Sequence, residues 1–259
     1  MDAQLPRDLS GQTAVVTGSS SGIGRAIALE LARAGAAVVV HARKSAVAAA
    51  DVARQIGDGG GSATVILSDL ATVEGQDALL DQAWQWRDRV DIWVNNAGAD
   101  ILTGESAGWT FERKLAALLQ IDVTATVRLG RLAGARMKAA GGGTIVNIGW
   151  DGAWRGMGGD SAELYAAAKG AVMAFTRSLA QSLAPEVRVN CVAPGWIKTA
   201  WGQQASERWQ DRARRESLLR RWGTPEEVAG AVRFLVSPAA GFITAEVINV
   251  NGGYRCLDD

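Results

Sequence analysis

The stretch TAVVTGSSSGIGRAIALELARAG, residues 13–35, carries the first indication of the fold. It begins with a short apolar run, passes through a turn that contains three glycines, and ends in a helical pattern closed by Gly35. A strand that leads through a glycine-rich turn directly into a helix is typical of the start of a βαβ unit. The stretch therefore predicts a parallel sheet covered by helices.

The same alternation of short strands and helices continues along the chain. Six further runs are apolar on both faces, as buried parallel strands are, namely AAVVVHA, ATVILSD, VDIWVNN, GTIVNIG, VRVNCVA and EVINVNG. Helical patterns lie between them, and one of these, SAELYAAAKGAVMAFTRSLAQSLA, is stopped by Pro185. No long linker, repeat or low-complexity tract divides the chain. We expect one α/β domain over residues 1–259, a Rossmann-type doubly wound parallel sheet of seven strands with helices on both faces.

Composition excludes several classes of function. Among 259 residues, 48% are apolar, which is enough for a sizeable core, and 27 basic residues balance 27 acidic ones. A neutral chain has no field to hold nucleic acid, so no nucleic-acid partner is expected. No apolar run reaches membrane length and the first residues lack the core of a signal peptide, so we expect a cytoplasmic protein with no membrane partner. His41 is the single histidine, and Cys191 and Cys256 are the two cysteines, which predicts no metal site.

The glycine turn has the properties of a phosphate-binding loop. Gly18, Gly22 and Gly24 would let backbone N–H groups approach a pyrophosphate, and the start of the following helix would add the positive end of its dipole. Such a loop alone is a weak signal, because glycines also form ordinary turns. Its position between a first strand and a helix strengthens the interpretation.

At this point the chain resembles the short-chain dehydrogenase/reductase family. TGSSSGIG is similar to that family's Thr-Gly-x-x-x-Gly-x-Gly loop, NNAG at residues 95–98 to its turn after the fourth strand, and YAAAK at residues 165–169 to its Tyr-x-x-x-Lys pair. SDL at residues 68–70 resembles the segment that packs on adenine, and RVNCVAPGWIKT the segment over the nicotinamide. RWGTPEEVA and VNGG match the family's ending. Among its members, the chain resembles 3-oxoacyl-thioester reductases and related carbonyl reductases.

The resemblance implies an NAD(P)-dependent oxidoreductase and a set of cofactor-binding residues. These are Gly18, Ser20, Ser21, Gly22, Ile23, Gly24, Asp69, Leu70, Asn96, Ala97, Gly98, Tyr165, Lys169, Pro194, Gly195, Ile197 and Thr199, with Arg43 and Lys44 at the end of the second strand.

The choice between the two nicotinamide cofactors depends on the end of the second strand. An acidic residue there accepts hydrogen bonds from the adenine ribose and repels a 2′-phosphate. Arg43 and Lys44 occupy this place, and a guanidinium binds phosphate well, so NADP(H) is favoured over NAD(H). Two observations weigh against this preference: both cations can be solvated surface residues, and Ser21 stands where NADP-dependent members often have a second basic residue.

Tyr165 and Lys169 form the candidate reacting pair. They are one helical turn apart, so they lie on one face of a helix. A nearby ammonium is expected to lower the pKa of the phenol, which would let Tyr165 exchange a proton with a substrate carbonyl or alcohol. By resemblance, Lys169 also holds the nicotinamide ribose.

Two polar residues of the family pattern are missing. The catalytic serine should follow NIG at residues 147–149, but Trp150, Asp151 and Gly152 stand there. Ser161 has a hydroxyl, yet we expect it to cap the following helix, with Glu163 close behind. We expect Asp151, walled by Trp150 and Trp154, to face the nicotinamide beside Tyr165.

The second missing residue is an asparagine of the central helix, which Asp122 replaces. Carboxylates only accept hydrogen bonds, so they disfavour a ketone-derived oxyanion and suit a cationic iminium or an alcohol undergoing oxidation. The alternative is structural: Asp122 pairs with Lys169, and Asp151 is a turn residue.

The substrate side is rich in tryptophan. Trp150 and Trp154 flank the missing serine, and the region after PG, the substrate lid of the family, contains Trp196, Trp201, Trp209 and Trp222. These predict a bulky or aromatic substrate, although core and interface tryptophans are an alternative. Three functions stay open: NADP(H)-dependent carbonyl or alcohol chemistry, altered chemistry such as iminium reduction or a non-redox reaction, and a nucleotide-binding regulator without turnover. By resemblance, helices at residues 111–132 and 162–180 should form a homotetramer or homodimer.

Overall fold

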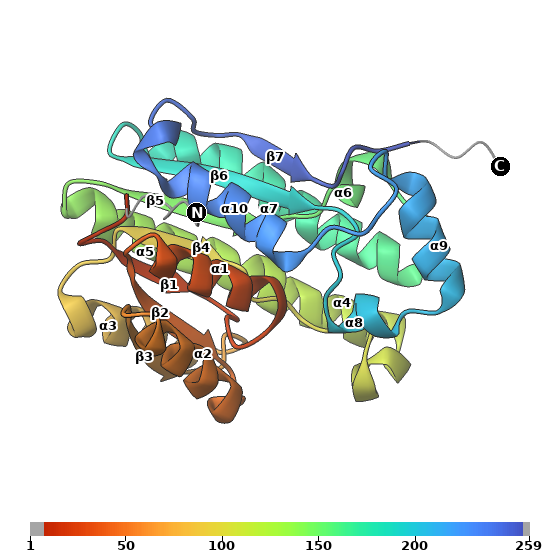
Figure 1. Cartoon of the computed structure of the whole chain (residues 1–259), viewed down its shortest axis with the longest axis horizontal. Helices are drawn as coiled ribbons and strands as arrows, with labels where there is room; N and C mark the ends of the chain where they lie inside the picture. The colour runs from red at the N-terminus through yellow and green to blue at the C-terminus, as the bar shows by residue number, and fades with distance from the viewer. Residues whose placement is uncertain (1–7, 256–259) are drawn as a thin grey trace, which may run out of the picture.

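A computed structural model describes residues 8–255, which form a parallel sheet with helices on both faces (Figure 1). The seven strands of this part of the chain are β1 (Thr13–Val16), β2 (Ala37–Ala42), β3 (Ser62–Leu67), β4 (Ile92–Asn95), β5 (Gly143–Ile148), β6 (Val187–Pro194) and β7 (Val247–Val250). All neighbours run parallel in the order β3-β2-β1-β4-β5-β6-β7. The predicted fold class and all seven predicted strands are confirmed.

The order of strands creates a crevice between β1 and β4. The chain builds outward from β1 to β3 in one direction and from β4 to β7 in the other. At such a reversal the connections leave on opposite faces, and ligands bind beyond the carboxyl ends of the strands. The glycine turn follows β1 and the NNAG turn follows β4, so both sequence motifs lie at this crevice.

Two apolar cores lie on opposite faces of the sheet. One joins the strands to α1 (Gly22–Arg33), α2 (Ala46–Asp58) and α10 (Pro225–Val236). The other joins them to α3 (Val73–Arg87), α5 (Thr126–Ala139) and α7 (Asp160–Leu183). Alternate strand residues feed each core, since Ala14 and Val16 belong to the first and Val15 to the second. Each strand is thus buried on both faces, as its uninterrupted apolar sequence predicts.

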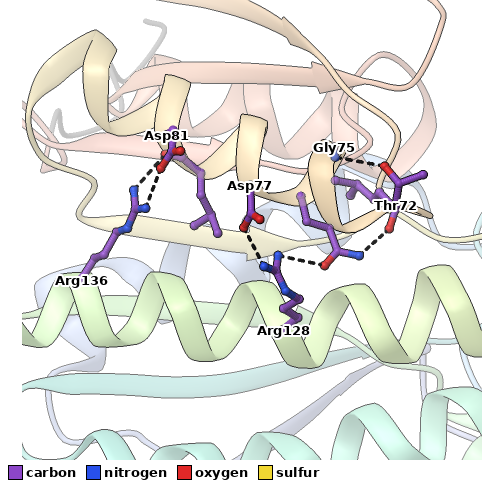
Figure 2. A network of polar contacts seen from close by, with 9 residues as sticks. Thr72, Gly75, Asp77, Asp81, Arg128 and Arg136 are labelled. Atoms are coloured by element: carbon purple, nitrogen blue, oxygen red, sulfur yellow. Dashed lines mark hydrogen bonds and ion pairs between the residues drawn. The ribbon is translucent and has the colours of Figure 1, made fainter.

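Ion pairs fix α3 against α5 (Figure 2). Arg128 donates to Asp77 Oδ1 at 2.7 Å. Arg136, two turns further along α5, donates at 2.6 Å to Oδ1 of Asp81, one turn further along α3. Thr72 caps α3 by accepting a hydrogen bond from the Gly75 N–H at 3.0 Å. These contacts orient α5, the helix that continues from the segment containing Asp122.

The remaining short elements gather around the carboxyl ends of the strands. They are the 3₁₀ turn η1 (Gly104–Gly108), α4 (Phe111–Leu118), the π-helical turn η2 (Leu119–Ala125), α6 (Gly152–Arg155), α8 (Ala200–Gln204) and α9 (Glu207–Glu216). A further 3₁₀ turn, η3 (Pro238–Ala240), precedes β7. Figure 1 shows α6, α8 and α9 together at the end of the molecule toward which the strands point. Within residues 8–255 no helix is both long and apolar enough to span a membrane.

The start of α7 corrects one sequence expectation. Ser161 does not cap the helix: α7 begins at Asp160, and Gly159 is the N-cap residue, with no side-chain cap hydrogen bond. Gly159 has φ +105°, a conformation that residues with a side chain rarely adopt, so the chain enters the helix before it reaches the serine. The acidic residues Asp160 and Glu163 lie in the first turn, where their negative charges interact favourably with the positive end of the helix dipole.

Candidate functional site

Two glycines of the loop after β1 stand where a side chain would not fit. A Cβ on Gly24 would lie 2.3 Å from the Gly18 carbonyl oxygen, and one on Gly18 would lie 2.9 Å from the Ala97 Cα. These two glycines therefore let the loop fold against itself and against the turn after β4. Gly22 has φ +55°, and a Cβ there would meet only the Thr199 side chain, at 3.9 Å. Ser21, the N-cap of α1, makes no side-chain cap, so the first turn of that helix is open to an anion.

The NNAG turn braces this loop from the neighbouring strand. The N–H groups of Asn96 and Ala97 each donate to Thr17 Oγ1 at 2.9 Å. The Asn96 amide donates to the carbonyls of Thr17 and Gly18, at 2.8 and 3.1 Å. Thr17, which sequence reasoning did not single out, thus joins the two turns. The only local signal for it was its place directly before Gly18.

Three other predicted cofactor segments lie at the same edge of the sheet. Arg43 and Lys44 follow β2 with exposed side chains that, within the described residues, form no ion pair. Asp69 follows β3, where its Oδ1 accepts a hydrogen bond from the Ala71 N–H at 3.0 Å, and Leu70 is buried. Pro194 ends β6, Ile197 is buried, and Thr199, beside Gly22, is the N-cap residue of α8 without a side-chain cap hydrogen bond. The structure therefore brings the predicted segments together around one crevice, and their contact with a cofactor stays a prediction.

Tyr165 and Lys169 lie on one face of α7, and Asp122 of η2 meets them. Lys169 Nζ lies 2.9 Å from Asp122 Oδ1 and donates to the Ile148 carbonyl at 3.1 Å. That Oδ1 has no well-aligned hydrogen bond, so the contact is an ion pair. Asp122 is 1% exposed, and its Oδ2 accepts from the Ala99 N–H at 2.8 Å. The structural interpretation, that Asp122 pairs with Lys169, is confirmed.

The ion pair between Asp122 and Lys169 also explains why residue 98 of the NNAG turn is a glycine. A Cβ at this position would lie 2.8 Å from Asp122 Oδ1. The absence of a side chain at Gly98 therefore makes room for the carboxylate between the turn and Lys169.

The expected lowering of the phenol pKa is wrong for this structure. Burial raises the pKa of Tyr165 well above its ordinary value, and the carboxylates of Asp122 and Asp100 raise it further. The ammonium expected to lower this pKa, on Lys169, is paired with the Asp122 carboxylate. The Tyr165 hydroxyl donates to the Ala99 carbonyl at 3.4 Å. Tyr165 is therefore held as a protonated phenol.

Asp151 lies in the turn after β5 and is 5% exposed. Its Oδ2 accepts from Arg155 at 2.6 Å and from the Asn251 amide at 3.0 Å. The ring of Trp150, which precedes Asp151, contacts the Tyr165 ring edge-on, with the two ring centroids 6.3 Å apart. The turn interpretation of Asp151 is confirmed, and its place beside the reacting carbonyl stays a prediction. Sequence reasoning missed Asn251, which no local pattern connects to a residue 100 positions earlier.

The four tryptophans of the lid pack mainly on one another. Trp196 lies 6.2, 5.7 and 5.7 Å, centroid to centroid, from Trp201, Trp209 and Trp222. The Trp196 indole N–H donates to Glu216 Oε2 at 2.8 Å, and Arg212 donates to Oε1 at 2.6 Å. These tryptophans form a small core for α8 and α9. This agrees with the alternative that some of the tryptophans are core residues.

Two hollows adjoin Asp151. A cleft of about 560 Å³ is lined by Trp154, Arg155, Arg177, Asn249, Asn251 and Tyr254 in addition to Asp151. A narrow pocket of about 20 Å³ includes Trp150, Met157, Trp196, Arg212 and Glu216 in its lining. The Tyr165 side chain is in the lining of neither hollow, but Trp150, which lines the narrow pocket, contacts the Tyr165 ring.

No group of three or more metal-ligating side chains occurs in residues 8–255. Cys191 is buried beneath the site, and burial raises the pKa of its thiol to about 12. A thiol with so high a pKa is a poor nucleophile. Cys256 lies outside the described residues.

Comparisons with known proteins agree with this geometry. Residues 18–255 match the sequence model of a family described as enoyl-(acyl carrier protein) reductase. A pig protein, dehydrogenase/reductase SDR family member 4, is 36% identical over 253 residues, which cover 95% of this chain and 88% of the pig protein. The chain belongs to the short-chain dehydrogenase/reductase family. It is therefore an NAD(P)-dependent oxidoreductase by membership of that family.

Solved structures of relatives superpose closely on this fold. A 7α-hydroxysteroid dehydrogenase complexed with NADH and 7-oxo glycochenodeoxycholic acid has a TM-score of 0.87 and 31% identity, with 96% of each chain covered. A 3-oxoacyl-(acyl-carrier-protein) reductase from Agrobacterium tumefaciens with NADP bound has a TM-score of 0.86 and 36% identity, with 98% of each chain covered. Relatives thus bind either nicotinamide cofactor, and the resemblance to 3-oxoacyl reductases is confirmed.

Proposed function

We propose that this chain is an NADP(H)-dependent enzyme that interconverts a carbonyl and an alcohol on a bulky or aromatic substrate. The observation that carries the proposal is the placement of Tyr165 and Lys169 on one face of α7, next to the crevice formed by the glycine loop and the NNAG turn. A regulator without turnover would have little use for this pair.

The Tyr165 phenol is the proton donor and acceptor. As a buried, protonated phenol it gives its proton to the oxygen of a carbonyl during reduction, and it must lose that proton before it can act as a base in oxidation. Lys169, which Asp122 and the Ile148 carbonyl hold, is the proposed ligand of the nicotinamide ribose, by analogy with the family. The cofactor, when bound, supplies or accepts the hydride.

Asp151 is the polar residue nearest in sequence to the position of the family's serine. Its bonds from Arg155 and Asn251 use Oδ2, so Oδ1 is the oxygen left for a substrate. While it is paired with Arg155, Asp151 is a hydrogen-bond acceptor, so Tyr165 is the group that donates to a carbonyl.

NADP(H) is the proposed cofactor because Arg43 and Lys44 are exposed at the end of β2 and, among the described residues, have no ion-pair partner of their own. The glycines of the loop leave space for a diphosphate at the start of α1. The protein residues present therefore fit a dinucleotide that carries an additional phosphate on its adenine ribose.

We infer a bulky or aromatic substrate from the Trp150 ring, which lies edge-on to the Tyr165 phenol, and from the cleft of about 560 Å³ beside Asp151, which Trp154 and Tyr254 line. Flat apolar groups stack favourably on such rings.

A second candidate is the reduction of an iminium ion. It is favoured by one observation: Asp122 and Asp151, which replace neutral groups of the family pattern, are both buried, at 1% and 5% exposure. A buried carboxylate stabilises a cation more than it stabilises an oxyanion. Matched cyclic substrates that differ only in a ketone or an iminium group would separate the two candidates by kcat/KM.

The test of the proposed function is Tyr165→Phe. Purified protein is assayed for NADPH oxidation with aromatic ketones, 3-oxoacyl thioesters and cyclic imines, and for the reverse reaction with alcohols. We expect the variant to lose about 10²–10⁴-fold in turnover while its affinity for NADPH is kept. Full turnover in the variant, or none in the unaltered protein with every substrate, would contradict the proposal.

A further inference from the structure

The single histidine lies buried beneath the candidate cofactor crevice. His41 is in β2, 2% exposed, and outside the reacting centre. Its Nδ1 accepts a hydrogen bond from the Gly18 N–H at 3.0 Å. Its Nε2 lies 3.1 Å from the Ser68 carbonyl and 3.2 Å from the Ser68 hydroxyl. The imidazole therefore connects the glycine loop after β1 with the end of β3.

The main chain of His41 holds the same loop. Its N–H donates to Ser19 Oγ at 3.0 Å, and its carbonyl accepts from the Ser19 N–H at 2.9 Å. Together with the Nδ1 contact, three hydrogen bonds fix Gly18 and Ser19 to β2. The Asn96 amide holds the Gly18 carbonyl from the side of β4, so His41 and Asn96 clamp the loop between the two neighbours of β1.

These contacts define the state of the ring. Nδ1 accepts from Gly18, so it carries no proton, and the ring proton is on Nε2, where it is donated to Ser68. A second proton would place a donor against the Gly18 N–H. Burial lowers the pKa of His41 to about 4, although the Ser68 carbonyl and the Asp69 charge act in the opposite direction. The ring is thus neutral at any pH well above 4.

We propose that His41 is a positioning residue for the cofactor, whose Nδ1 acceptor holds Gly18 and sets the distance between the glycine loop and the segments after β2 and β3. The inference rests on the proposed function, since it concerns the same dinucleotide. Those three segments would surround the adenosine half, which NADH and NADPH share. His41 therefore acts on both cofactors equally, unlike Arg43.

The experiment compares three substitutions. An asparagine amide oxygen reaches the position of Nδ1, whereas a glutamine reaches that of Nε2. Affinities for NADH and NADPH are measured by fluorescence titration, with kcat at saturating cofactor. We expect His41→Gln and His41→Leu to weaken both cofactors roughly tenfold by similar factors, with kcat unchanged, and His41→Asn to stay within about threefold of the unaltered protein.

A buried control separates loop positioning from general destabilisation. Asn190 is fully buried, donates to the Ile243 carbonyl, and accepts from the Glu246 N–H, away from the cofactor loop. Asn190→Ala should lower thermal stability and leave both affinities intact. If it weakens cofactor binding as the His41 variants do, the positioning role is refuted.

The contrast between asparagine and glutamine keeps the test decisive when stability falls. Equal affinities in His41→Asn and His41→Gln, whether high or low, would overturn the role of the Gly18 contact. If the unaltered protein binds neither nucleotide, the proposed function fails, and this inference fails with it. If the unaltered protein binds and His41→Gln binds as tightly, only the His41 inference fails.

Discussion

Asp122 changes the electrostatics of the reacting pair. A Tyr–Lys pair works as a base when the ammonium stabilises the phenolate. In this protein the ammonium of Lys169 is 2.9 Å from a buried carboxylate, and burial and two carboxylates favour the protonated phenol. The arrangement keeps Tyr165 as a proton donor, which agrees with the proposed carbonyl reduction.

Replacing Asp122 by asparagine tests this view. The variant keeps an acceptor for the Ala99 N–H and removes the charge that raises the pKa of Tyr165. The pKa of Tyr165 should therefore fall. Alcohol oxidation, which needs the phenolate, should begin at a lower pH, and carbonyl reduction, which needs the phenol, should decline at a lower pH. Both limbs are read from kcat/KM against pH.

Asp100→Asn is the matched control. Asp100 is exposed and contributes less than Asp122 to raising the Tyr165 pKa. Its substitution should move the limbs in the same direction by a smaller amount. Identical profiles for Asp122→Asn and the unaltered protein would show that Asp122 does not set the charge state of Tyr165.

The exposed side chain of Arg43 is the basis of the proposed NADP preference. We expect its guanidinium to contact the 2′-phosphate, and a charge-assisted hydrogen bond contributes about 1.5–3 kcal/mol. Arg43→Ala should weaken NADPH binding roughly tenfold or more and leave NADH nearly unchanged. Calorimetry with each cofactor measures this. A loss that is equal for both cofactors would remove Arg43 as the basis of the NADP preference.

At the scale of elements, the lid is held by its own small core. The tryptophans at 196, 201, 209 and 222 pack together, and Glu216 ties Trp196 to Arg212. The last described residues add a second tie, because the Arg255 N–H donates to the Glu216 carbonyl at 2.7 Å and Asn251 holds Asp151. Residues 251–255 therefore join α9 to the turn after β5.

The ends of β1, β2 and β3 are joined by His41, which makes the stability of this part of the sheet dependent on pH. The unfolded pKa is 6.5 and the folded value about 4, so the unfolded chain takes up the proton first. The contribution of His41 to the free energy of unfolding is fully present above pH 6.5. It decreases by about 3 kcal/mol as the pH drops toward 4.

Urea unfolding at pH 7 and pH 4.5 measures this dependence. His41→Asn cannot titrate, so the stability difference between the unaltered protein and the variant should shrink at the lower pH. A difference that stays constant would mean that folding does not lower the pKa of His41.

Local pattern predicted the elements, and contacts between distant residues decided the site. The strands and the glycine motif could be predicted because burial on both faces and a strand–turn–helix order are visible in short windows. The state of Tyr165 could not, because it depends on burial and on Asp122, which lies 43 residues before it. Asp151 was placed in its turn, but Asn251 and Arg155, which hold its carboxylate, were not foreseen. Ser161 was misplaced because Gly159 starts the helix earlier.

Among the residues that the structure describes, α4, η2, α5 and α7 all expose apolar or small side chains. Large apolar side chains are exposed on α4, η2 and α5, namely Phe111 at 39%, Leu119 at 43% and Leu132 at 37%. On α7, exposed small residues recur at helical spacing, at Ala167, Ala171, Ala174 and Ser178. Small residues let a second helix approach closely, and apolar ones gain from burial. These are the helices expected from the sequence to contact other copies.

We expect a tetramer with two-fold symmetry, and Ala171→Arg should break it into smaller species. An arginine at the centre of the stripe separates the helices and places a charge in an apolar contact. Light scattering at micromolar concentration should give about four times the 27.2 kDa of one chain for the unaltered protein and a smaller mass for the variant.

Val47→Arg is the control, because Val47 is 87% exposed on α2, outside this surface, and its substitution should leave the mass unchanged. A monomer in the unaltered protein would refute the assembly. An unchanged mass in Ala171→Arg would place the contact on another surface, since an arginine cannot fit between two closely packed helices.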